Sequence, residues 1–272
     1  MTPVEITRGV GPIVLGMPHT GTFVPPEVME MLNDTGRELA NTDWHVDQLY
    51  DGLLADATVV RATFHRYVID ANRDPSGASL YPGQNTTGLV PLTDFDGAPL
   101  WQTEPDAAEI ERRRLAYHAP YHAALQAELE RVRAKHGVAI LWDCHSIRSV
   151  IPYLFDGTLP DFNIGTNNGE TCAPVLEEAV AKVCAEAPQT SVLNGRFRGG
   201  WTTRHYGQPA NGLHAIQMEM AYTTYLAAEE PPWTYDPTRA APARAVLADA
   251  LTALESLAPT LAQTHSQEGP NA

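Results

Sequence analysis

The sequence has 272 residues, of which 43% are hydrophobic and 19% charged, so it can bury the core of a globular domain. Its net charge of −15 repels phosphate backbones and argues against nucleic acid as a partner. The sequence has three scattered cysteines, and it shows neither a signal-peptide pattern nor a run of about 20 apolar residues. We therefore expect a cytoplasmic protein without a membrane partner.

The N-terminal part of the chain combines short apolar runs with a long loop. Residues 12–17 form an apolar run that stops at PHTG, which predicts a buried strand ending in a turn. Residues 57–64 predict a second strand, and residues 66–70 continue it or form the next one. Residues 74–100 are rich in Gly, Pro, Asn, Thr and Asp and predict a long loop. Such long loops are often functional, so we expect this one to close over a ligand.

Helices and strands alternate in the rest of the chain. Apolar spacing predicts a helix over 104–135, ended by Gly137, which Pro120 should break or kink. Residues 138–142 predict a buried strand, followed at once by DCHS. The remaining predicted elements are a helix over 173–187, strands over 191–195 and 215–221, a helix over 240–262, and a frayed tail from about 264 to 272.

This alternation predicts an α/β fold, with a mostly parallel or mixed sheet flanked by helices, in a single domain spanning residues 1–272. In such sheets ligands bind beyond the carboxyl ends of the strands. His19 follows the strand over 12–17, and His145 follows the strand over 138–142. We therefore expect both histidines at the same edge of the sheet.

Two histidines at one sheet edge are candidates for a metal site. Catalytic zinc takes three protein ligands and keeps one position for water. His19 and His145 could supply two ligands, and the segment TDWHVD offers Asp43 or Asp47 as the third. The alternatives are hydrogen-bonded turn histidines and, for Asp43, the N-cap of a helix over residues 44–54.

Glu219 is a candidate general base. It lies in the predicted strand AIQMEMA, where burying a carboxylate is costly unless it is paired or functional. A carboxylate beside a metal-activated water can take the water's proton. The alternative is an acid that faces outward on an edge strand.

Several residues could bind a substrate carboxylate. Arg73 can donate two parallel hydrogen bonds and Asn72 can add another, although the pair could also form a salt-bridged loop corner. The segment RFRGG at 196–200 places Arg198 beside glycines that allow close approach of a ligand, or forms an ordinary turn. Arg204 follows nearby.

Other chemistries find less support in the sequence. It has no G-x-S-x-G elbow and no glycine pattern for nucleotide binding. Cys144 and His145 are adjacent on an extended segment, so their side chains point apart and do not form a nucleophile–base pair. The roles of His118, His122 and His205, and the oligomeric state, stay open.

An ordered series of unusual segments resembles the N-formylglutamate amidohydrolase (deformylase) family along most of the chain. The segments are MPHTG (17–21), TDWHVDQLYD (42–51), VIDANRDPSG (68–77), LYPGQNTTGLVP (80–91), PYH (120–122), DCHS (143–146), LPDFNIGT (159–166), RFRGGWTTRHYG (196–207) and IQMEMAYTTY (216–225).

The resemblance implies a phosphorylase/hydrolase-like fold, similar to zinc carboxypeptidases and aspartoacylase-like deacylases. It implies zinc-dependent release of formate from N-formyl-L-glutamate, a dianionic substrate, in a route of histidine degradation. The related peptidases carry a Glu soon after the first His, which PHTGTF lacks, so the resemblance favours Asp43 as the third ligand, with Asp47 in reserve. Glu219 matches the general-base glutamate of these related enzymes, and Asn72 with Arg73 matches an Asn–Arg pair that binds the substrate carboxylate in them.

We therefore expect zinc on His19, Asp43 and His145, with Arg198 and Arg204 taking the second substrate carboxylate. Two other functions compete with this one. The first is a zinc deacylase of another N-acyl amino acid, such as an N-acyl aspartate. The second is a metal-binding protein without catalysis, which would need neither Glu219 nor Arg73.

Overall fold

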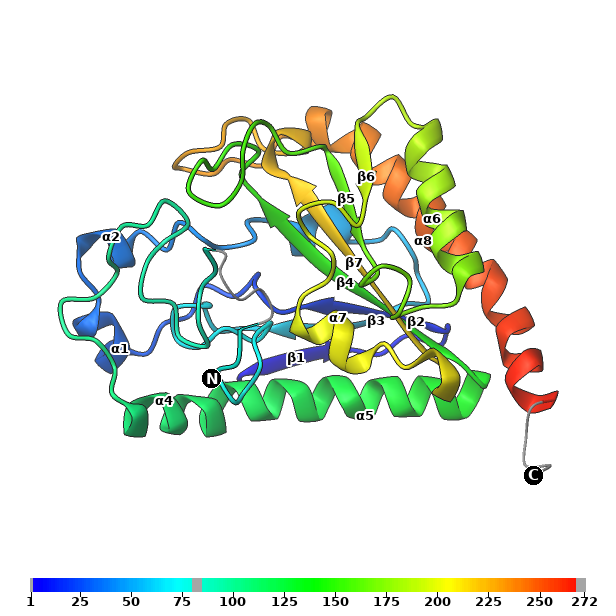
Figure 1. Ribbon diagram of the computed structural model, residues 1–272, viewed down its shortest axis with the longest axis horizontal. Helices are drawn as coiled ribbons and strands as arrows, with labels where there is room; N and C mark the ends of the chain where they lie inside the picture. The colour runs from blue at the N-terminus through cyan, green and yellow to red at the C-terminus, as the bar shows by residue number, and fades with distance from the viewer. Residues whose placement is uncertain (1, 80–84, 268–272) are drawn as a thin grey trace.

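A seven-stranded mixed sheet crosses the computed structural model, which describes residues 2–79 and 85–267 (Figure 1). The strand order is β1-β3-β2-β4-β7-β5-β6. Strands β3, β2, β4 and β7 are parallel, whereas β1 is antiparallel to β3, and β5 to β7. The bounds are β1 Val4–Thr7, β2 Ile13–Met17, β3 Thr58–Ala62, β4 Ala139–Ile147, β5 Phe162–Gly165, β6 Ser191–Leu193 and β7 Leu213–Ala221.

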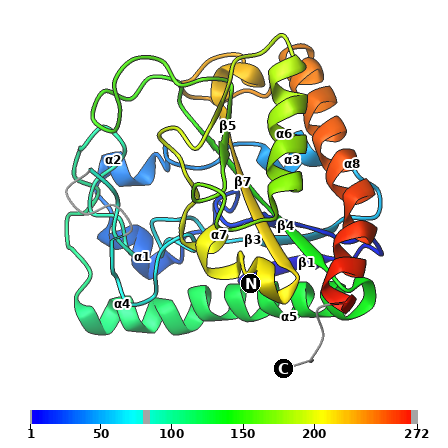
Figure 2. The same cartoon turned by 45° about the vertical axis from the view of Figure 1, so that its right-hand side comes forward.

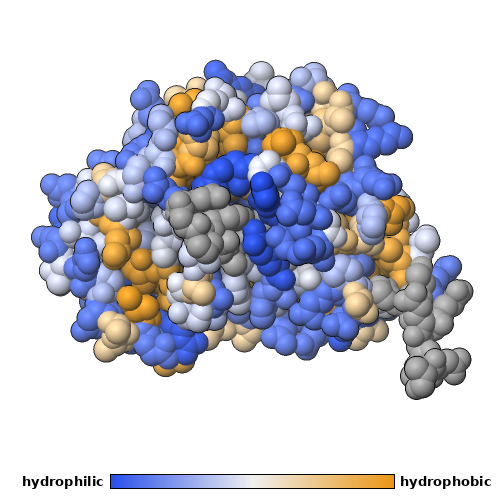
Figure 3. Space-filling view, viewed as in Figure 1, coloured by the Kyte–Doolittle hydropathy of each residue, from blue (hydrophilic) through white to orange (hydrophobic). Residues whose placement is uncertain are grey.

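Helices cover both faces of this sheet. Helix α5 lies along one face, while α3, α6 and α8 cover the other, with α6 and α8 side by side (Figure 2). On the side seen in Figure 1, strongly hydrophilic residues gather over the centre of the molecule, between smaller apolar patches (Figure 3). The helices are α1 Pro26–Met31, α2 Asp34–Arg37, α3 Val46–Tyr50, α4 Ala107–Arg113, the π-helix η1 Arg114–His118, α5 Ala119–His136, α6 Pro174–Glu186, α7 Trp201–Tyr206 and α8 Pro237–Gln267, with short 3₁₀ turns at Pro209–Asn211 and Tyr222–Thr224.

Side chains of β4 alternate between the two faces of the sheet. Trp142 and Cys144 point into the apolar core that α6 and α8 cover. Asp143 and His145 point to the opposite face and are also buried. Cys144 therefore points away from His145, as expected, and burial raises the pKa of its thiol. Asp143 and His145, near the carboxyl end of β4, are left to build a site.

The predicted strands over 12–17, 57–64, 138–142, 191–195 and 215–221 all form, with shifted ends. The expected α/β class with a mixed sheet is confirmed. The predicted helices over 173–187 and 240–262 correspond to α6 and α8. The sequence analysis overlooked β1, an exposed edge strand, and β5, whose four residues FNIG lie in a segment rich in loop-forming residues.

Two strand predictions are wrong in detail. Residues 66–70 form a buried turn, because the backbone amide of Tyr67 donates to Nδ1 of His65 and that of Val68 donates to the carbonyl of His65. Strand β4 does not end at Trp142 but continues to Ile147. His145 therefore lies within the strand instead of after it.

Pro120 neither breaks nor sharply interrupts the helical path. The chain passes from α4 through the π-helix into α5, and Pro120 sits in the first turn of α5. The amide of Ala119 donates to the carbonyl of Arg114, five residues back, which is the wider π spacing. Widening the turn just before the proline accommodates its ring and missing N–H.

Helix α8 differs from the sequence expectation in two respects. By length and composition alone its segment Pro237–Gln263 could cross a membrane, whereas the sequence analysis expected no such segment. Its side chains Leu247, Leu251 and Leu254 are buried in the core, and core helices of soluble proteins pass the same test. The helix also continues to Gln267, past the expected start of the frayed tail, and residues 268–272 lie outside the described residues.

Candidate active site

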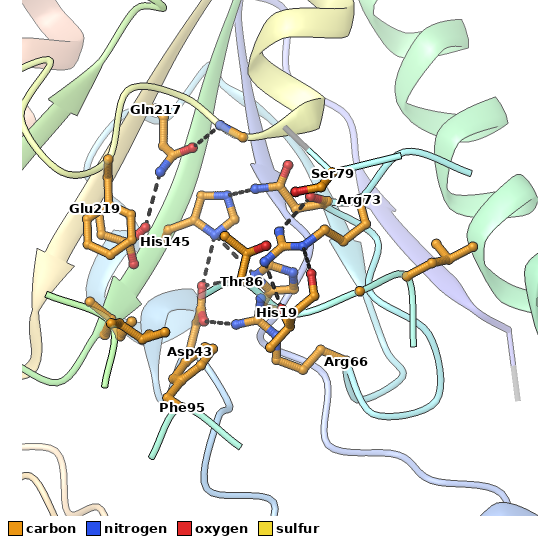
Figure 4. A pocket seen from close by; sticks show the side chains of 18 of the residues that line it. His19, Asp43, Arg66, Arg73, Ser79, Thr86, Phe95, His145, Gln217 and Glu219 are labelled. Atoms are coloured by element: carbon orange, nitrogen blue, oxygen red, sulfur yellow. Dashed lines mark hydrogen bonds and ion pairs between the residues drawn. The ribbon is translucent and has the colours of Figure 1, made fainter. Parts of the chain in front are cut away.

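Three buried side chains from separate elements meet at the carboxyl ends of the parallel strands (Figure 4). His19 follows β2, Asp43 precedes α3, and His145 lies on β4. Nδ1 of His145 lies 3.2 Å from Nδ1 of His19 and 3.1 Å from Oδ2 of Asp43, and the latter two atoms are 3.6 Å apart. This group could hold a metal ion. The histidines meet at one sheet edge, as the strand pattern predicts.

Carboxylates face the outer nitrogens of both histidines. Nε2 of His19 lies 2.7 Å from Oδ1 of Asp70, and Nε2 of His145 lies 3.1 Å from Oδ1 of Asp143. A carboxylate oxygen only accepts, so Asp70 favours a proton on Nε2 of His19, whereas Nε2 of His145 also faces a donor, Nδ2 of Asn72, at 3.0 Å. Nδ1 of His19 then turns its lone pair inward, and it converges with Nδ1 of His145 and a carboxylate oxygen of Asp43. Carboxylate–histidine pairs of this kind orient metal ligands in proteins.

The electrostatics of the cluster favour a positive charge at its centre. Burial alone would raise the pKa of Asp43, but His19 and His145 beside it hold that pKa below its usual range. Burial alone would lower the pKa of His145, yet Asp143 and Asp43 raise it well above its usual value. A carboxylate that stays ionised next to His145, whose pKa is raised, suits a bound cation.

Asp43 and Asp47 occupy different environments. Asp43 does not cap α3, whose N-cap is His45 and which has no side-chain cap bond. Its carboxylate instead accepts the backbone N–H of Ser146, and its own N–H donates to the carbonyl of His19. Asp47 is exposed and pairs with Arg61 at 3.3 Å. The structure thus brings Asp43 to the two histidines and leaves Asp47 on the surface.

Glu219 lies beside His145 on the neighbouring strand. The two residues are direct partners in the parallel β4–β7 pair, so their side chains share a face. Gln217 donates from Nε2 to Oε2 of Glu219, 3.1 Å away, and accepts the N–H of Gly200. Burial raises the pKa of Glu219 to about 8. Strand β7 is internal to the sheet, so Glu219 is not an outward-facing acid on an edge strand.

A pocket of about 220 Å³ opens over this cluster. Its wall includes His19, Asp43, His145 and Glu219, together with three arginines, Arg66, Arg73 and Arg196. The long loop also reaches it. Thr87 and Phe95 line the pocket, whereas residues 80–84, and with them part of the motif over 80–91, lie outside the described residues. Closure of that loop over a ligand stays a prediction.

The predicted carboxylate-binding residues are only partly brought together. Arg73 lines the pocket and donates from Nε to the carbonyl of Thr87 at 2.8 Å. Asn72 lines it too, with Nδ2 3.0 Å from Nε2 of His145. Arg198 is exposed and donates to the carbonyl of Gly195, and neither Arg198 nor Arg204 is part of the described pocket wall. Arg196 lies in that wall instead.

Sequence reasoning missed the support behind His19. Arg66 donates from Nη2 to Oδ2 of Asp70 at 2.7 Å and lies 3.7 Å from Asp43. Its guanidinium also packs over Phe95, 5.0 Å from the ring centre. Burial alone would raise the pKa of Asp70, but Arg66 and His19 hold it well below its usual value. The available signal was the i,i+4 spacing of Arg66 and Asp70, which a strand prediction over 66–70 obscured.

The pocket is concave and lies at the carboxyl ends of the strands of an α/β sheet. It contains buried histidines, carboxylates and a glutamate of raised pKa, a combination typical of an enzyme active site. The family model for N-formylglutamate amidohydrolase matches residues 11–226. The chain therefore belongs to the N-formylglutamate amidohydrolase family, which confirms the resemblance seen in the sequence.

Individual relatives agree with this assignment. The chain is 49% identical over 251 residues to N-formylglutamate deformylase of Pseudomonas putida, covering 91% of this chain and 93% of the relative. It is 46% identical over 255 residues to N-formylglutamate deformylase of Pseudomonas aeruginosa, covering 92% and 95%. The crystal structure of N-formylglutamate amidohydrolase from Ralstonia eutropha JMP134 superposes with a TM-score of 0.76 at 26% identity, covering 98% of this chain and 99% of that one.

Proposed function

We propose that this enzyme hydrolyses N-formyl-L-glutamate to formate and L-glutamate, with zinc held by His19, Asp43 and His145. The observation that carries the proposal is the convergence of these three ligands beside Glu219 in a pocket that also contains Arg73 and Arg196. The names of the Pseudomonas relatives support the substrate. A place in histidine degradation and kinship with zinc carboxypeptidases remain implications of the sequence resemblance.

The donor set fits zinc in number, kind and spacing. Two imidazoles and one carboxylate are a common set of protein ligands for catalytic zinc. Ligand atoms bonded to a tetrahedral zinc ion at 2.0–2.1 Å are about 3.3 Å from one another. The three distances between Nδ1 of His19, Nδ1 of His145 and Oδ2 of Asp43 are 3.2, 3.1 and 3.6 Å. The cluster therefore matches the size of a zinc site.

Bound zinc would lower the pKa of a water molecule and draw charge from the formyl oxygen. Glu219 then takes a proton from the attacking water on a carboxylate oxygen while the water oxygen bonds to the formyl carbon. The C–N bond breaks next, and Glu219 delivers the same proton to the departing amine. Gln217 holds the Glu219 carboxylate through Oε2 during both transfers. Asp70 keeps the imidazole of His19 oriented, and Asn72 contacts that of His145.

Two arginines suit the two carboxylates of the substrate. Arg66 pairs with the carboxylate of Asp70, and Arg73 and Arg196 are the other two arginines in the described pocket wall. Arg73 is held by Thr87 through Nε and Nη2 and by the carbonyl of Asn72 through Nη1. Arg196 is held by the carbonyl of Leu154 and by stacking over Phe197 at 5.4 Å. We therefore assign the second carboxylate to Arg196 in place of Arg198 and Arg204.

Arg196→Ala and Arg73→Ala should each raise KM for N-formyl-L-glutamate by roughly tenfold to a hundredfold, because each removes a charged hydrogen-bond donor to a carboxylate. Arg198→Ala is the matched control, since it removes an exposed arginine two residues away. Steady-state kinetics of the three variants checks this. An unchanged KM in Arg196→Ala together with a raised KM in Arg198→Ala would return the second carboxylate to Arg198.

The proposed function as a whole is tested by formate release from N-formyl-L-glutamate, together with metal analysis of the purified protein. We expect about one zinc ion per chain, activity lost on chelation and activity regained with added zinc. N-formyl-L-aspartate and N-acetyl-L-aspartate are the comparison substrates. Faster turnover of either would favour the alternative deacylase, and bound metal without turnover of any of them would favour a non-catalytic metal-binding protein.

A further inference from the structure

Two histidines outside the proposed zinc site contact the backbone of residues 71–73. Nε2 of His122 lies 2.8 Å from the carbonyl oxygen of Ala71, and Nε2 of His118 lies 3.0 Å from the carbonyl oxygen of Arg73. The carbonyl between them, that of Asn72, accepts from Nη1 of Arg73 itself. All three carbonyls of this short turn are therefore hydrogen-bonded to side chains.

The contacts fix the protonation of both rings. A carbonyl oxygen only accepts, so each Nε2 must carry a proton and donate it. Burial lowers the pKa of His122 to about 3 and also lowers that of His118, which keeps both rings neutral near pH 7. Nδ1 of His122 is then an acceptor, and the hydroxyl of Tyr206 lies 3.0 Å from it. Trp201 covers the rings of both histidines.

The π-helix places the two histidines. His118 ends η1 and His122 lies one turn later in α5, so both project from one side of a continuous helical path. The centres of their rings lie 4.3 Å apart. This spacing allows the two rings to donate to the carbonyls of Ala71 and Arg73, which are two residues apart in the facing turn. π segments inside α-helices are rare and often occur at functional sites. Here the wider π-helical turn determines where His118 contacts the segment over residues 71–73.

The clamped turn carries two side chains of the pocket. Asn72 faces Nε2 of His145 through Nδ2 and accepts the N–H of Thr202 through Oδ1. A Cβ added to Gly200 would lie 2.4 Å from Nδ2 of Asn72, so the fit around this amide is tight. Arg73 extends from the same backbone into the pocket. A shift of the turn would therefore displace Asn72 and Arg73 together.

We propose that His118 and His122 are positioning residues for substrate binding: they clamp the carbonyls of Arg73 and Ala71 and so aim Asn72 and Arg73 at the substrate. The substrate part of this inference rests on the proposed function, in which Arg73 binds a carboxylate. The clamp itself rests on the contacts alone. Because Arg73 would bind the carboxylate equally before and during the reaction, loosening it affects KM more than kcat.

The test compares His118→Leu and His122→Leu with His118→Gln and His122→Gln. Leucine removes the donor, whereas the side-chain amide of glutamine can still donate to the carbonyl. His136→Leu is the control, because His136 also donates from α5 to a carbonyl, that of Val10, far along the chain from the pocket. Formate-release kinetics, zinc content and hydrogen–deuterium exchange of a peptide covering residues 68–74 are measured for each variant.

We expect the leucine variants to raise KM roughly tenfold with kcat within about twofold, to keep one zinc ion, and to exchange faster over residues 68–74. The glutamine variants should restore both properties, and His136→Leu should change neither. Wild-type KM and exchange in folded leucine variants would overturn the clamp. If a leucine variant does not fold, the glutamine variants decide. Wild-type KM together with wild-type exchange over residues 68–74 would support the clamp, because the glutamine amide restores the donor. Wild-type KM with fast exchange would overturn the proposal, because a loosened turn would then leave substrate binding unaffected. If the wild-type protein releases no formate, the proposed function fails and the exchange comparison alone decides the clamp.

Discussion

Glu219→Gln is expected to lower kcat by about 10²–10⁴-fold, the usual contribution of a general base. Glutamine keeps the shape of the side chain and can still contact Gln217, but it cannot take a proton from water. The proposed zinc ligands are untouched, so the variant should retain its metal. Formate release at saturating substrate, with metal analysis of the same sample, measures both effects.

The pH dependence adds a second signature of Glu219. A base works only without its proton, so wild-type kcat/KM should fall as the pH is lowered through the pKa of Glu219, which burial raises. The Glu219→Gln variant should lack this fall, because its residual rate no longer depends on that proton. Glu178→Gln, an exposed change on α6, is the control and should leave the rate and the pH profile unaltered. Near-normal turnover of Glu219→Gln would remove Glu219 from the role of base.

The convergence of His19 and His145 could be predicted because it depends on only two local patterns. Each histidine lies close to the end of a buried apolar run, and parallel strands bring their carboxyl ends to one sheet edge. The prediction held although β4 runs on through His145, since that extension leaves the residue at the same edge. Strand period also separated Cys144 from His145 correctly.

The arginines proposed to bind the substrate could not be assigned in the same way. Arg196 and Arg198 lie in one irregular segment, and the path of that segment decides which one faces the pocket. Gly199, at a φ of 109°, helps to set that path, in a region that other residues rarely adopt. Sequence patterns report which residues could bind a carboxylate, but they do not report such a path.

The support behind the histidines depends on contacts between distant segments. Asp70 reaches His19 across 51 positions of the chain, and His118 reaches the carbonyl of Arg73 across 45. Neither pair has a periodic signal. The apolar run around Asp70 reads as a strand because it is fully buried, and burial alone does not distinguish a strand from a buried turn.

Asp43→Asn should abolish tight zinc binding, whereas Asp47→Asn should leave it unchanged. The two acids lie four residues apart in one motif, so the sequence offers both as the third ligand. The structure separates them: the carboxylate of Asp43 is buried between His19 and His145, and that of Asp47 pairs with Arg61 at the surface. Replacing a carboxylate ligand by a neutral amide removes the negative charge that a doubly charged ion needs in a buried site.

Zinc content after dialysis against a chelator, together with formate release, measures the outcome for both variants. We expect about one zinc ion per chain in the wild-type protein and Asp47→Asn, and activity below about 1% in Asp43→Asn, because loss of a metal ligand removes the activation of water. Circular dichroism of Asp43→Asn checks that the loss is local, as expected because Arg66 keeps its partner Asp70. Zinc retained by Asp43→Asn and lost by Asp47→Asn would mean that the segment before α3 rearranges when metal binds, with α3 turning Asp47 inward in place of Asp43.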